Sequence, residues 1–397
     1  MKRVLSLSTL YPNAARPRFG TFVARSLEGL AAETDWDVTV VNPIGIPPIR
    51  FGEYIRLAGA AVDGLENGVT VYRPTFPLIP KLGGRINPAM IARSVLPLAR
   101  KLHARHPFDI VDAQFFYPDG PAAAKIAEEL GLPLSIKARG ADIHYWGEQN
   151  YANRMMREAS QQASGLLAVC EALAGDMAAI GLPRDKVTIH YTGLDRDLFR
   201  PLNHTKLRER LSDELGIDLQ GEEPILATVG ALIERKGQAF VIEALTQLPT
   251  ARLLLVGKGE DEAALRALAA DRGVADRVHF LGLLDHKILP IVLSAADAMV
   301  LPSASEGLAN AWVEALACGT PIVITDAGGA HEVVTDLSAG VIVARTTDAI
   351  AQGVSDVLAR PVDRQATSRM AERFDWQVNG RKLGEYFDRL VGEHRPA

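Results

Sequence analysis

The sequence predicts an α/β protein of two doubly wound, Rossmann-like domains that face each other across a cleft. Three observations point to this fold. A chain of 397 residues is too long for one ordinary core. Short apolar runs alternate with helical patterns, as in parallel sheets covered on both faces. These runs also fall into two sets of similar size, separated by a polar segment near 199–222. Each domain then offers a site at the C-terminal ends of its strands.

The apolar runs give the expected strands in chain order. We expect an N-terminal domain over 1–198 and a C-terminal domain over 199–375. A final helix over 376–397 carries one apolar face and is expected to cross back to the N-terminal domain. The strands of the first set are 4–8, 38–41, 69–72, 110–113, 133–137, 166–169 and 187–190, and those of the second are 225–229, 253–256, 278–281, 298–301, 322–325 and 341–343.

Composition excludes several classes of protein. Hydrophobic residues make up 48% and charged residues 23% of the chain, which is typical of a globular protein and not of a disordered one. Cys170 and Cys318 are the only cysteines, which argues against a disulfide framework or a zinc site. The first apolar stretch is broken by Pro12 and reads as a strand, not a signal peptide. No apolar run is long enough to span a bilayer, so we expect a cytoplasmic protein.

The segment from Val300 to Glu314 carries the most specific chemistry. It places Glu306 and Glu314 eight residues apart, with Gly307 and then a helix start following a predicted strand. The first N–H groups of a helix lack internal partners and favour an anion such as phosphate. A carboxylate beside them is better suited to accept hydrogen bonds from hydroxyls. The segment therefore indicates a sugar or ribose next to a phosphate.

Two further loops follow strands in the same half. Arg235 and Lys236 precede a predicted helix, where basic side chains can neutralise a diphosphate together with the helix dipole. A solvated loop pair is the alternative. The turn at Gly257 and Gly259 lacks the third glycine of a dinucleotide fingerprint, so a tight turn without a ligand is equally compatible with it.

These segments together resemble the family 4 retaining glycosyltransferases, which have the GT-B fold. The resemblance rests on Pro302-Ser-x-x-Glu-Gly, on Glu314 eight residues after Glu306, on Ala-Cys-Gly-Thr-Pro321 and on Gly328-Gly-Ala-His-Glu332. It covers about 150 residues of the second half, and the segment from Gly193 to Pro201 is also similar to the family's interdomain segment. The motifs are specific as to family and weak as to substrate.

The resemblance implies roles for individual residues. Arg235 and Lys236 would bind the donor diphosphate, Glu306 would hold the donor sugar, and Glu314 would accept the ribose hydroxyls. Ala231 departs from the family, where many members have Arg at this position. The remaining donor-binding positions implied in this half are Gly230, Gly257, Gly282, Leu284, Gly307, Leu308, Ala309 and Asn310.

The first half is expected to hold the acceptor. Gly20 and Thr21 occupy the turn that in the family approaches the donor phosphates, although a simple strand–helix turn is an alternative. Arg139 stands where many relatives have His. It stays protonated and cannot act as a base, but it can stabilise negative charge on the departing phosphate. Asp142 matches the family's Asp. His144 is a candidate to replace the missing His, against the alternative of a satisfied structural His.

A basic stretch also lies in this half. From Asn67 to Phe108 there is no Asp or Glu, and Arg85–Arg105 combines basic residues with an apolar stripe that includes Ile91 and Val95. This suits peripheral contact with the anionic inner face of the plasma membrane or a lipid-phosphate acceptor. The alternative is an ordinary amphipathic helix docked on the sheet, and Pro97 is expected to interrupt or kink it.

The sequence thus predicts a retaining glycosyltransferase of the exopolysaccharide or cell-wall glycan type. Its donor is a nucleotide-sugar co-substrate, with UDP slightly favoured over GDP, and its acceptor is a glycan or lipid-linked hydroxyl. Glu306, Lys236, Arg235 and Arg139 form the predicted catalytic group, with no metal, cofactor or nucleic-acid partner. The alternatives are a GT-B nucleotide-sugar epimerase or hydrolase, a nicotinamide or flavin oxidoreductase, and a non-catalytic member of a glycan assembly complex.

Overall fold

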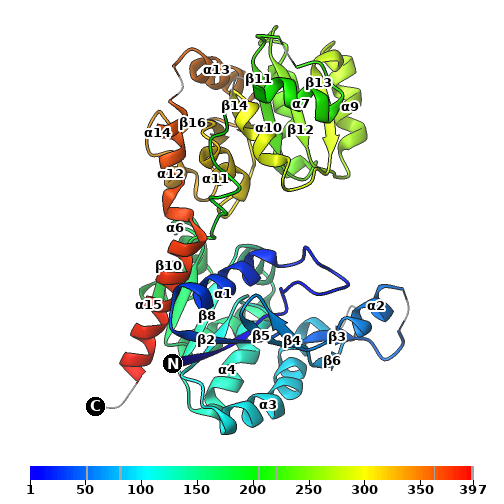
Figure 1. The fold of residues 1–397 in the computed structure, drawn as a ribbon. Helices are drawn as coiled ribbons and strands as arrows, with labels where there is room; N and C mark the ends of the chain where they lie inside the picture. The colour runs from blue at the N-terminus through cyan, green and yellow to red at the C-terminus, as the bar shows by residue number, and fades with distance from the viewer. Residues whose placement is uncertain (51, 80–82, 204–205, 220, 362, 395–397) are drawn as a thin grey trace. The chain divides into compact units, whose positions relative to one another are not determined.

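The fold is described from a computed structural model, over residues 1–50, 52–79, 83–203, 206–219, 221–361 and 363–394. The chain divides into two compact units (Figure 1). Met1–Gly193 together with Trp376–Ala397 forms unit 1, and Leu194–Asp375 forms unit 2. Each unit is an α/β structure around a sheet of its own, which confirms the predicted fold class.

Unit 1 is built on an eight-stranded sheet in the order β10-β9-β8-β7-β1-β2-β5-β4. Its strands are parallel except for the antiparallel pairing of β4 with β5. The strand order reverses at β1, which lies between β2 and β7. The strands are β1 (Lys2–Leu7), β2 (Trp36–Val41), β4 (Gly64–Glu66), β5 (Val69–Tyr72), β7 (Ile110–Ala113), β8 (Leu134–Ala138), β9 (Gly165–Ala168) and β10 (Val187–Ile189), and a separate parallel pair joins β3 (Ile44–Ile46) to β6 (Thr75–Pro77).

Helices follow most of these strands. They are α1 (Thr21–Glu33), α2 (Glu53–Gly59), α3 (Asn87–Arg105), α4 (Asp119–Leu130), α5 (Asn150–Gln162) and α6 (Glu171–Ala179), with short turns η1 (Gly83–Arg85), η2 (Asp142–Trp146) and η3 (Arg184–Lys186). The element η2 is a π-helix.

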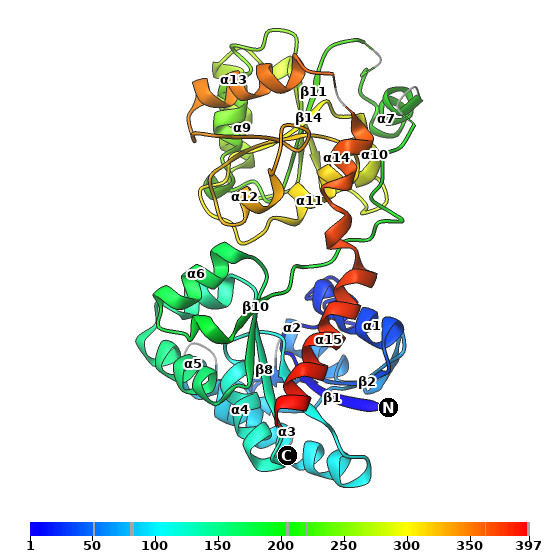
Figure 2. The same cartoon turned by 90° about the vertical axis from the view of Figure 1, so that its left-hand side faces the viewer.

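The last helix of the chain, α15 (Trp376–His394), completes the core of unit 1. Its apolar face, including Leu383 and Phe387, is buried with residues of α1 and β2. Phe387 meets Trp36 edge to face at 5.5 Å between ring centroids. Gly380 lies against the backbone of Gly29, where a larger residue would overlap the carbonyl of Gly29. Figures 1 and 2 both show α15 beside α1.

Unit 2 is built on a six-stranded parallel sheet in the order β13-β12-β11-β14-β15-β16. The strands are β11 (Ile225–Val229), β12 (Arg252–Val256), β13 (Val278–Gly282), β14 (Ala298–Leu301), β15 (Ile322–Thr325) and β16 (Gly340–Val343). The helices and turns are α7 (Leu207–Leu215), η5 (Glu234–Lys236), α8 (Gln238–Ala244), α9 (Glu262–Asp271), η6 (Ala275–Arg277), α10 (Leu289–Ala295), α11 (Asn310–Ala317), α12 (Ala330–Val333), α13 (Thr347–Leu358), α14 (Arg364–Arg369) and η7 (Glu372–Phe374).

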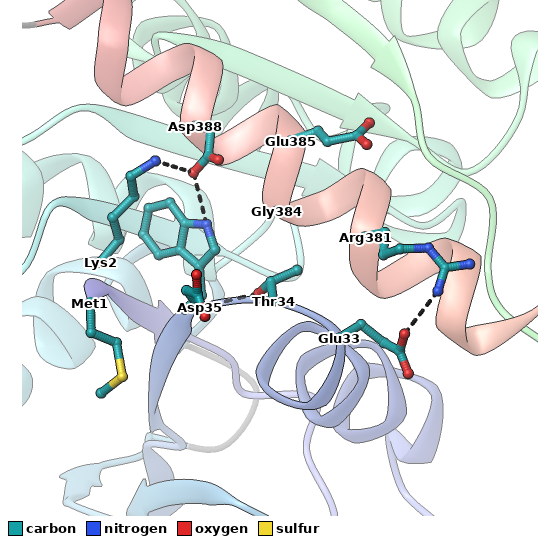
Figure 3. Close-up of a pocket in the computed structure, with 10 residues that line it drawn as sticks. Met1, Lys2, Glu33, Thr34, Asp35, Arg381, Gly384, Glu385 and Asp388 are labelled. Atoms are coloured by element: carbon teal, nitrogen blue, oxygen red, sulfur yellow. Dashed lines mark hydrogen bonds and ion pairs between the residues drawn. The ribbon is translucent and has the colours of Figure 1, made fainter.

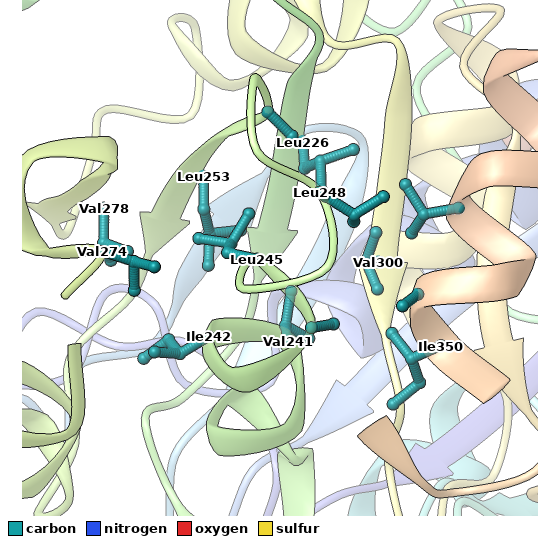
Figure 4. Close-up of a cluster of buried hydrophobic side chains, with 14 of the residues drawn as sticks. Leu226, Val241, Ile242, Leu245, Leu248, Leu253, Val274, Val278, Val300 and Ile350 are labelled. Carbon is teal, nitrogen blue, oxygen red and sulfur yellow. The ribbon is translucent and has the colours of Figure 1, made fainter. Parts of the chain in front are cut away.

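The helices of unit 2 form two layers. One layer holds α8, α9 and α13, which contact one another, and the other holds α7, α10, α11 and α14. Between the first layer and the sheet lies a core in which Leu226, Leu253 and Val300 meet Ile242 and Ile350 (Figure 4). Continuous apolar strands are required here because both faces of the sheet are covered.

Each of the thirteen predicted strands is present, within two residues at either end. The short strands β3, β4 and β6 were not predicted. Helix α3 runs through Pro97 from Asn87 to Arg105, so the expected interruption at this residue is wrong. Among the described residues, no helix is both long and apolar enough to cross a lipid bilayer.

Candidate functional site

The loops that carry the predicted donor residues leave adjacent strands of unit 2. Strands β11 and β14 are neighbours at the centre of the sheet, but α8 after β11 and α11 after β14 belong to opposite helical layers. The two loops therefore diverge at the C-terminal edge of the sheet. This is the topological switch point, where open α/β sheets bind ligands. Arg235 and Lys236 lie on the first loop, and Glu306 lies on the second.

An ion-pair cluster joins these two loops. The Nζ atom of Lys236 contacts Oε1 of Glu306, and Nη1 of Arg235 lies 3.5 Å from Oε2 of the same carboxylate. The side chains of Lys236 and Glu306 are 14% and 9% exposed, whereas that of Arg235 is 44% exposed. The structure thus brings the two predicted cations and one predicted acid together, with most of the free surface on Arg235.

Backbone hydrogen bonds hold the loops in register. The amide of Ala304 donates to the carbonyl of Arg235 at 2.7 Å. Arg345 spans both loops, because Nε donates to Pro302 O at 2.9 Å and Nη2 donates to Glu234 O at 2.8 Å. Sequence reasoning did not single out Arg345. A lone Arg after an apolar strand gives no signal that it caps two distant carbonyls.

Two glycines allow the close approach of these loops. Gly237 precedes α8 with a φ of 75°, and a Cβ there would overlap the carbonyl of Pro302. Gly328 has a φ of 53°, and its Cβ would overlap the carbonyls of Glu306 and Gly307. The amide of Gly329 then donates to Gly307 O at 2.7 Å. Other residues disfavour this left-handed region, so the Gly328-Gly motif positions the Glu306 loop.

The turns after β11, β12 and β13 are packed in the same way. Gly257 has a φ of 142°, and a Cβ there would overlap the carbonyl of Gly230. Its amide donates to Gly282 O at 2.8 Å. Leu284, two residues further on, is half-buried. The glycines at Gly230, Gly257 and Gly282 thus keep side chains away from this part of the C-terminal edge.

Helix α11 begins beside Glu306 and carries Glu314. No side chain caps its N-terminus at Ala309, so its first amides keep their capacity to bind an anion. Gly307 and Leu308 are half-buried, and Asn310 is exposed. Burial raises the pKa of Glu314 to about 7, and among the described residues no group forms a hydrogen bond with its carboxylate. An acid without a partner next to free amides is equipped to accept ligand hydroxyls.

The residues predicted in unit 1 lie near β1, where the strand order of the unit 1 sheet also reverses. Gly20 precedes α1 with a φ of 73°, and its position against the backbone of Leu10 leaves no room for a Cβ. Thr21, the first residue of α1, is exposed. Gly20 therefore has a clear structural reason for being glycine, and Thr21 presents its hydroxyl at the N-terminus of α1.

Arg139 is fixed by the loop after β7. Its Nε donates to Gln114 O at 2.8 Å, Nη2 donates to the Gln114 side chain, and the guanidinium lies 4.9 Å from the ring centroid of Phe22. Burial lowers the pKa of Arg139 to about 10, and the nearby Asp142 opposes this shift. The side chain is thus cationic at neutral pH and is held at the C-terminal edge of β8.

Asp142 and His144 are held in different ways. The carboxylate of Asp142 is buried and accepts hydrogen bonds from the amides of Phe116, Arg139 and Gly140 at 2.8 to 2.9 Å. It shapes the loop around Arg139 and has little capacity left for a ligand. His144 is exposed and lies 2.9 Å from Asp176 through Nε2.

A buried polar network beneath this edge was missed by sequence reasoning. Lys137 is fully buried in β8, and its Nζ lies 2.7 Å from Nδ1 of His190. The carbonyl of Asn379 accepts from Nε2 of His190 at 3.0 Å, so Nδ1 is free to accept from Lys137. Burial lowers the pKa of Lys137 well below its usual range. The signal was a single charged residue, Lys137, inside a short strand of otherwise uncharged residues.

A pocket of about 470 Å³ lies elsewhere in unit 1 (Figure 3). It is lined by the starts of β1 and β2 and by α15, with Lys2 paired to Asp388 and Arg381 paired to Glu33. The pocket opens at the N-terminal edge of the sheet, opposite to Gly20 and Arg139. Because α/β sheets bind ligands at the other edge, the pocket is not the candidate site.

Two family models match the chain. Residues 19–193 match the model described as glycosyl transferase 4-like domain, and residues 212–374 match glycosyl transferases group 1. The boundary between the two matches coincides with the end of the first segment of unit 1. The matched ranges include every strand of the unit 2 sheet and every strand of the unit 1 sheet except β1.

Curated relatives carry related descriptions. The chain is 34% identical over 211 residues to the GDP-mannose-dependent alpha-(1-6)-phosphatidylinositol monomannoside mannosyltransferase of Mycolicibacterium smegmatis, a match that covers 49% of this chain and 54% of the relative. The chain thus spans about half the length of this relative. It is 26% identical over 335 residues to the putative teichuronic acid biosynthesis glycosyltransferase TuaC of Bacillus subtilis, with 82% of each chain covered.

Solved structures share the whole fold. Sucrose-phosphate synthase from Thermosynechococcus elongatus superimposes with a TM-score of 0.75 at 19% identity, covering 99% of this chain and 100% of that one. HepE of Anabaena, solved in complex with UDP-glucose, gives a TM-score of 0.69 at 20% identity, with 98% and 100% covered. At these identities the likeness establishes the fold alone.

Proposed function

Because this chain belongs to the group 1 glycosyltransferase family and has the GT-B fold, we propose that it transfers a sugar from a nucleotide diphosphate to an acceptor hydroxyl with retention of anomeric configuration. The observation that carries the proposal is the cluster of Lys236, Arg235 and Glu306 at the switch point of unit 2. Free amides at the start of α11 and the unpartnered Glu314 lie on the same loop and helix.

These groups match the parts of a nucleotide-sugar. When the bond between the sugar and the diphosphate breaks, negative charge develops on the departing phosphate. Lys236, Arg235 and the helix dipole of α11 are placed to stabilise that charge. Glu306 then turns from its cations to the sugar hydroxyls, and Glu314 accepts the ribose hydroxyls. Most of the catalytic effect comes from holding the reactants and stabilising the leaving group.

The acceptor is proposed to bind unit 1, next to Arg139. Gln114 and Phe22 hold the guanidinium in one orientation, so it is pre-organised to face a developing negative charge. The names of relatives include enzymes of phosphatidylinositol mannoside, teichuronic acid and lipopolysaccharide core synthesis. They support a glycan or a lipid-linked sugar as acceptor. UDP-sugars are the first donors to test, and GDP-sugars are the second.

A thermal-shift screen tests the donor site. UDP, GDP and ADP and their glucose and mannose derivatives are added to the full chain, because a ligand that binds only the folded state raises the melting temperature. At a hundred times the Kd the stabilisation is about 2.7 kcal/mol, or roughly 5–10 °C for a unit of this size. Lys236→Ala should lose the shift. If no nucleotide shifts the wild-type protein, the proposed function is wrong.

The reaction type is tested with the donor that binds. A transferase should release little nucleotide from donor alone and much more when a sugar acceptor is added. A hydrolase or epimerase would consume the donor without an acceptor. A non-catalytic protein would bind the donor and leave it intact. The anomeric proton coupling of the product, measured by NMR, distinguishes retention from inversion.

We also propose a purely electrostatic contact of α3 with anionic lipid. The apolar stripe of α3 is not available for insertion, because Ile91 and Val95 are fully buried within unit 1. The exposed residues Arg93, Lys101 and Arg105 leave a basic surface. Such attraction is screened by salt. Co-sedimentation with phosphatidylserine vesicles should therefore occur at 50 mM salt and be lost at 500 mM salt, and retention at high salt would contradict the proposal.

A further inference from the structure

Four aromatic residues gather near the C-terminal edge of unit 1, and we name Tyr117, Tyr145, Trp146 and Tyr151 the aromatic cluster. Tyr117 follows β7, Tyr145 and Trp146 end the π-helix η2 after β8, and Tyr151 begins α5. The ring of Trp146 lies 4.9 Å from that of Tyr117 and 5.0 Å from that of Tyr145, between centroids. Tyr151 meets Tyr117 edge to face at 6.3 Å.

The exposure of the four side chains increases from the inner ring of the cluster, Tyr117, to the outer ring, Tyr145. Tyr117 is fully buried and donates its hydroxyl hydrogen bond to Gly84 O. Trp146 and Tyr151 are half-buried. Tyr145 is 61% exposed, more than any other aromatic residue in the part of the chain that the structure describes. The outermost ring of the cluster is therefore accessible to a ligand from solvent.

The base of the cluster is rigid. The carboxylate of Asp142 ties the start of η2 to the amides of Phe116 and Gly140. The guanidinium carbon of Arg85 lies 5.1 Å from the ring centroid of Tyr151. Irregular helices of the π type occur most often at functional sites. Rings fixed in advance lose little conformational freedom when a ligand arrives.

The polar atoms of the outer rings are unused. Among the described residues, no group forms a hydrogen bond with the hydroxyls of Tyr145 and Tyr151 or with the indole Nε1 of Trp146. His144 directly precedes Tyr145 in η2. Its Nε2 atom lies 2.9 Å from the carboxylate of Asp176, which belongs to α6. The cluster therefore combines apolar ring faces with free donors at their edges.

A pyranose ring has the matching chemistry. Its C–H groups carry partial positive charge and pack on the negative face of an aromatic ring, while its hydroxyls take hydrogen bonds around the edge. The cluster also follows Arg139 in the same loop, since Asp142 holds both the backbone of Arg139 and the start of η2. We propose that the aromatic cluster binds a sugar ring of the acceptor, an inference that rests on the proposed function.

Direct binding of simple glycosides tests this inference. The probes are methyl α-D-glucopyranoside, methyl α-D-mannopyranoside and methyl β-D-galactopyranoside, up to 50 mM, followed by saturation-transfer NMR and tryptophan fluorescence on the full chain. At least one should bind the wild-type protein. Tyr145→Ala should weaken its binding by about three- to tenfold, as expected for the loss of one stacked ring. Tyr145→Phe, which keeps the ring, should retain most of the affinity.

A matched control separates this effect from general damage. Leu65 is 76% exposed in the same unit, and Leu65→Ala should change neither glycoside binding nor melting temperature. Tyr145→Ala should also keep the nucleotide thermal shift. If nucleotides fail to bind, the proposed function fails, but glycoside binding still reports on the cluster. If nucleotides bind and no glycoside does, or if Tyr145→Ala binds glycosides as well as the wild type, the inference is overturned.

Discussion

Glu314 is the residue whose protonation most directly limits the proposed donor site. Burial raises its pKa to about 7, above the ordinary value of 4.5. The folded state therefore binds the proton more tightly than the unfolded state, and stability falls as pH rises from about 4.5 to about 7. The ionised carboxylate accepts hydrogen bonds from ribose hydroxyls through both oxygens, whereas the protonated group carries a donor O–H on one of them and accepts more weakly. Donor binding and stability are thus expected to respond to pH in opposite directions.

We predict that affinity for a UDP-sugar rises between pH 6 and pH 8. With a pKa of about 7, the ionised fraction of Glu314 rises roughly tenfold over this interval, and the affinity should follow. The pyrophosphate of a UDP-sugar does not titrate in this range, so calorimetry can measure the effect directly. Glu314→Gln should give weaker binding without a pH dependence, and should be more stable than the wild type at pH 8. A pH-dependent Glu314→Gln variant would contradict the prediction.

The pair of Lys236 and Glu306 gives a second prediction. Lys236→Ala leaves the carboxylate of Glu306, which is 9% exposed, with only Arg235 at 3.5 Å. Loss of its closer cationic partner from this mostly buried carboxylate should cost about 1–3 kcal/mol of stability. In a Glu306→Gln background the same change should cost less, because no charge is left unpaired. Thermal unfolding of the wild type, the two single variants and the double variant measures these costs in stability. Equal costs of Lys236→Ala in both backgrounds would show that Lys236 and Glu306 do not pair.

The two variants should also separate stability from activity. Lys236→Ala and Glu306→Gln are each expected to reduce transfer by at least about a hundredfold, the scale of losing one electrostatic contact to a leaving group. Lys236→Arg keeps the charge and should retain part of the activity. A variant with near wild-type turnover would remove that residue from the proposed mechanism.

At the residue scale the sequence predicted candidates but not their contacts. Glu306, Lys236 and Arg235 were chosen because they follow predicted strands, and the structure brings their side chains together. Their pairing with one another was not predictable, because it depends on two loops 70 residues apart. The burial of Lys137 beside His190 was likewise hidden. A side chain's partners come from strands that only the sheet order makes neighbours.

At the scale of elements, the turn at Gly328 offers a direct test of loop positioning. Gly328→Ala adds a Cβ that would overlap the carbonyls of Glu306 and Gly307, at a φ of 53°. The Glu306 loop must therefore shift, and donor affinity should fall at least tenfold. Gly131→Ala is the matched control. Gly131 has a similar φ of 64° but nothing within 4 Å of its Cβ position, so it should cost about 1 kcal/mol from strain alone and leave donor binding unchanged. If Gly328→Ala and Gly131→Ala lost donor affinity to a similar extent, backbone strain and not the position of the Glu306 loop would explain the loss.

The elements themselves were largely predictable. Strands such as β11 and β14 are almost entirely apolar because both faces of the sheet are buried, and this gives a clear signal. The strands β3, β4 and β6 have three residues each, too few for a pattern to stand out. Helix α3 continues through Pro97, since its buried residues Ile91 and Val95 anchor the preceding turns, and packing outweighs the local preference.

At the scale of the whole molecule, each unit has its own core, yet unit 1 needs the last helix of the chain. Phe387 is fully buried and packs on Trp36. Phe387→Ala should cost about 3–5 kcal/mol. The loss should fall on unit 1, so hydrogen exchange should quicken in β1, β2 and α1 and stay unchanged in β11 and β12. Leu337→Ala, at a residue 66% exposed in unit 2, is the control. Faster exchange in β11 would contradict the independence of the two cores.

The sequence indicated two domains, because apolar runs fell into two sets, and the boundary was expected after residue 198. The switch points at β1 and β11 could not be read from it, since strand order depends on which helices cover which face. The resemblance to a family supplied residue roles, and the structure adds the contacts that hold those residues. The aromatic cluster of unit 1 escaped notice because Tyr117 follows β7, whereas the other three members follow β8 in η2 and α5.

The late position of α15 has a consequence for how the protein is made. Synthesis runs from the amino to the carboxyl end of a chain, so β1, α1 and β2 leave the ribosome long before Leu383 and Phe387 exist to cover them. All residues of unit 2 are translated in the interval. Unit 2 can therefore finish folding first. Until α15 is made, the nascent amino-terminal segment exposes apolar surface to which chaperones can bind. Synthesis of α15, the last element that contributes to this core, therefore sets the earliest moment at which the core of unit 1 is complete.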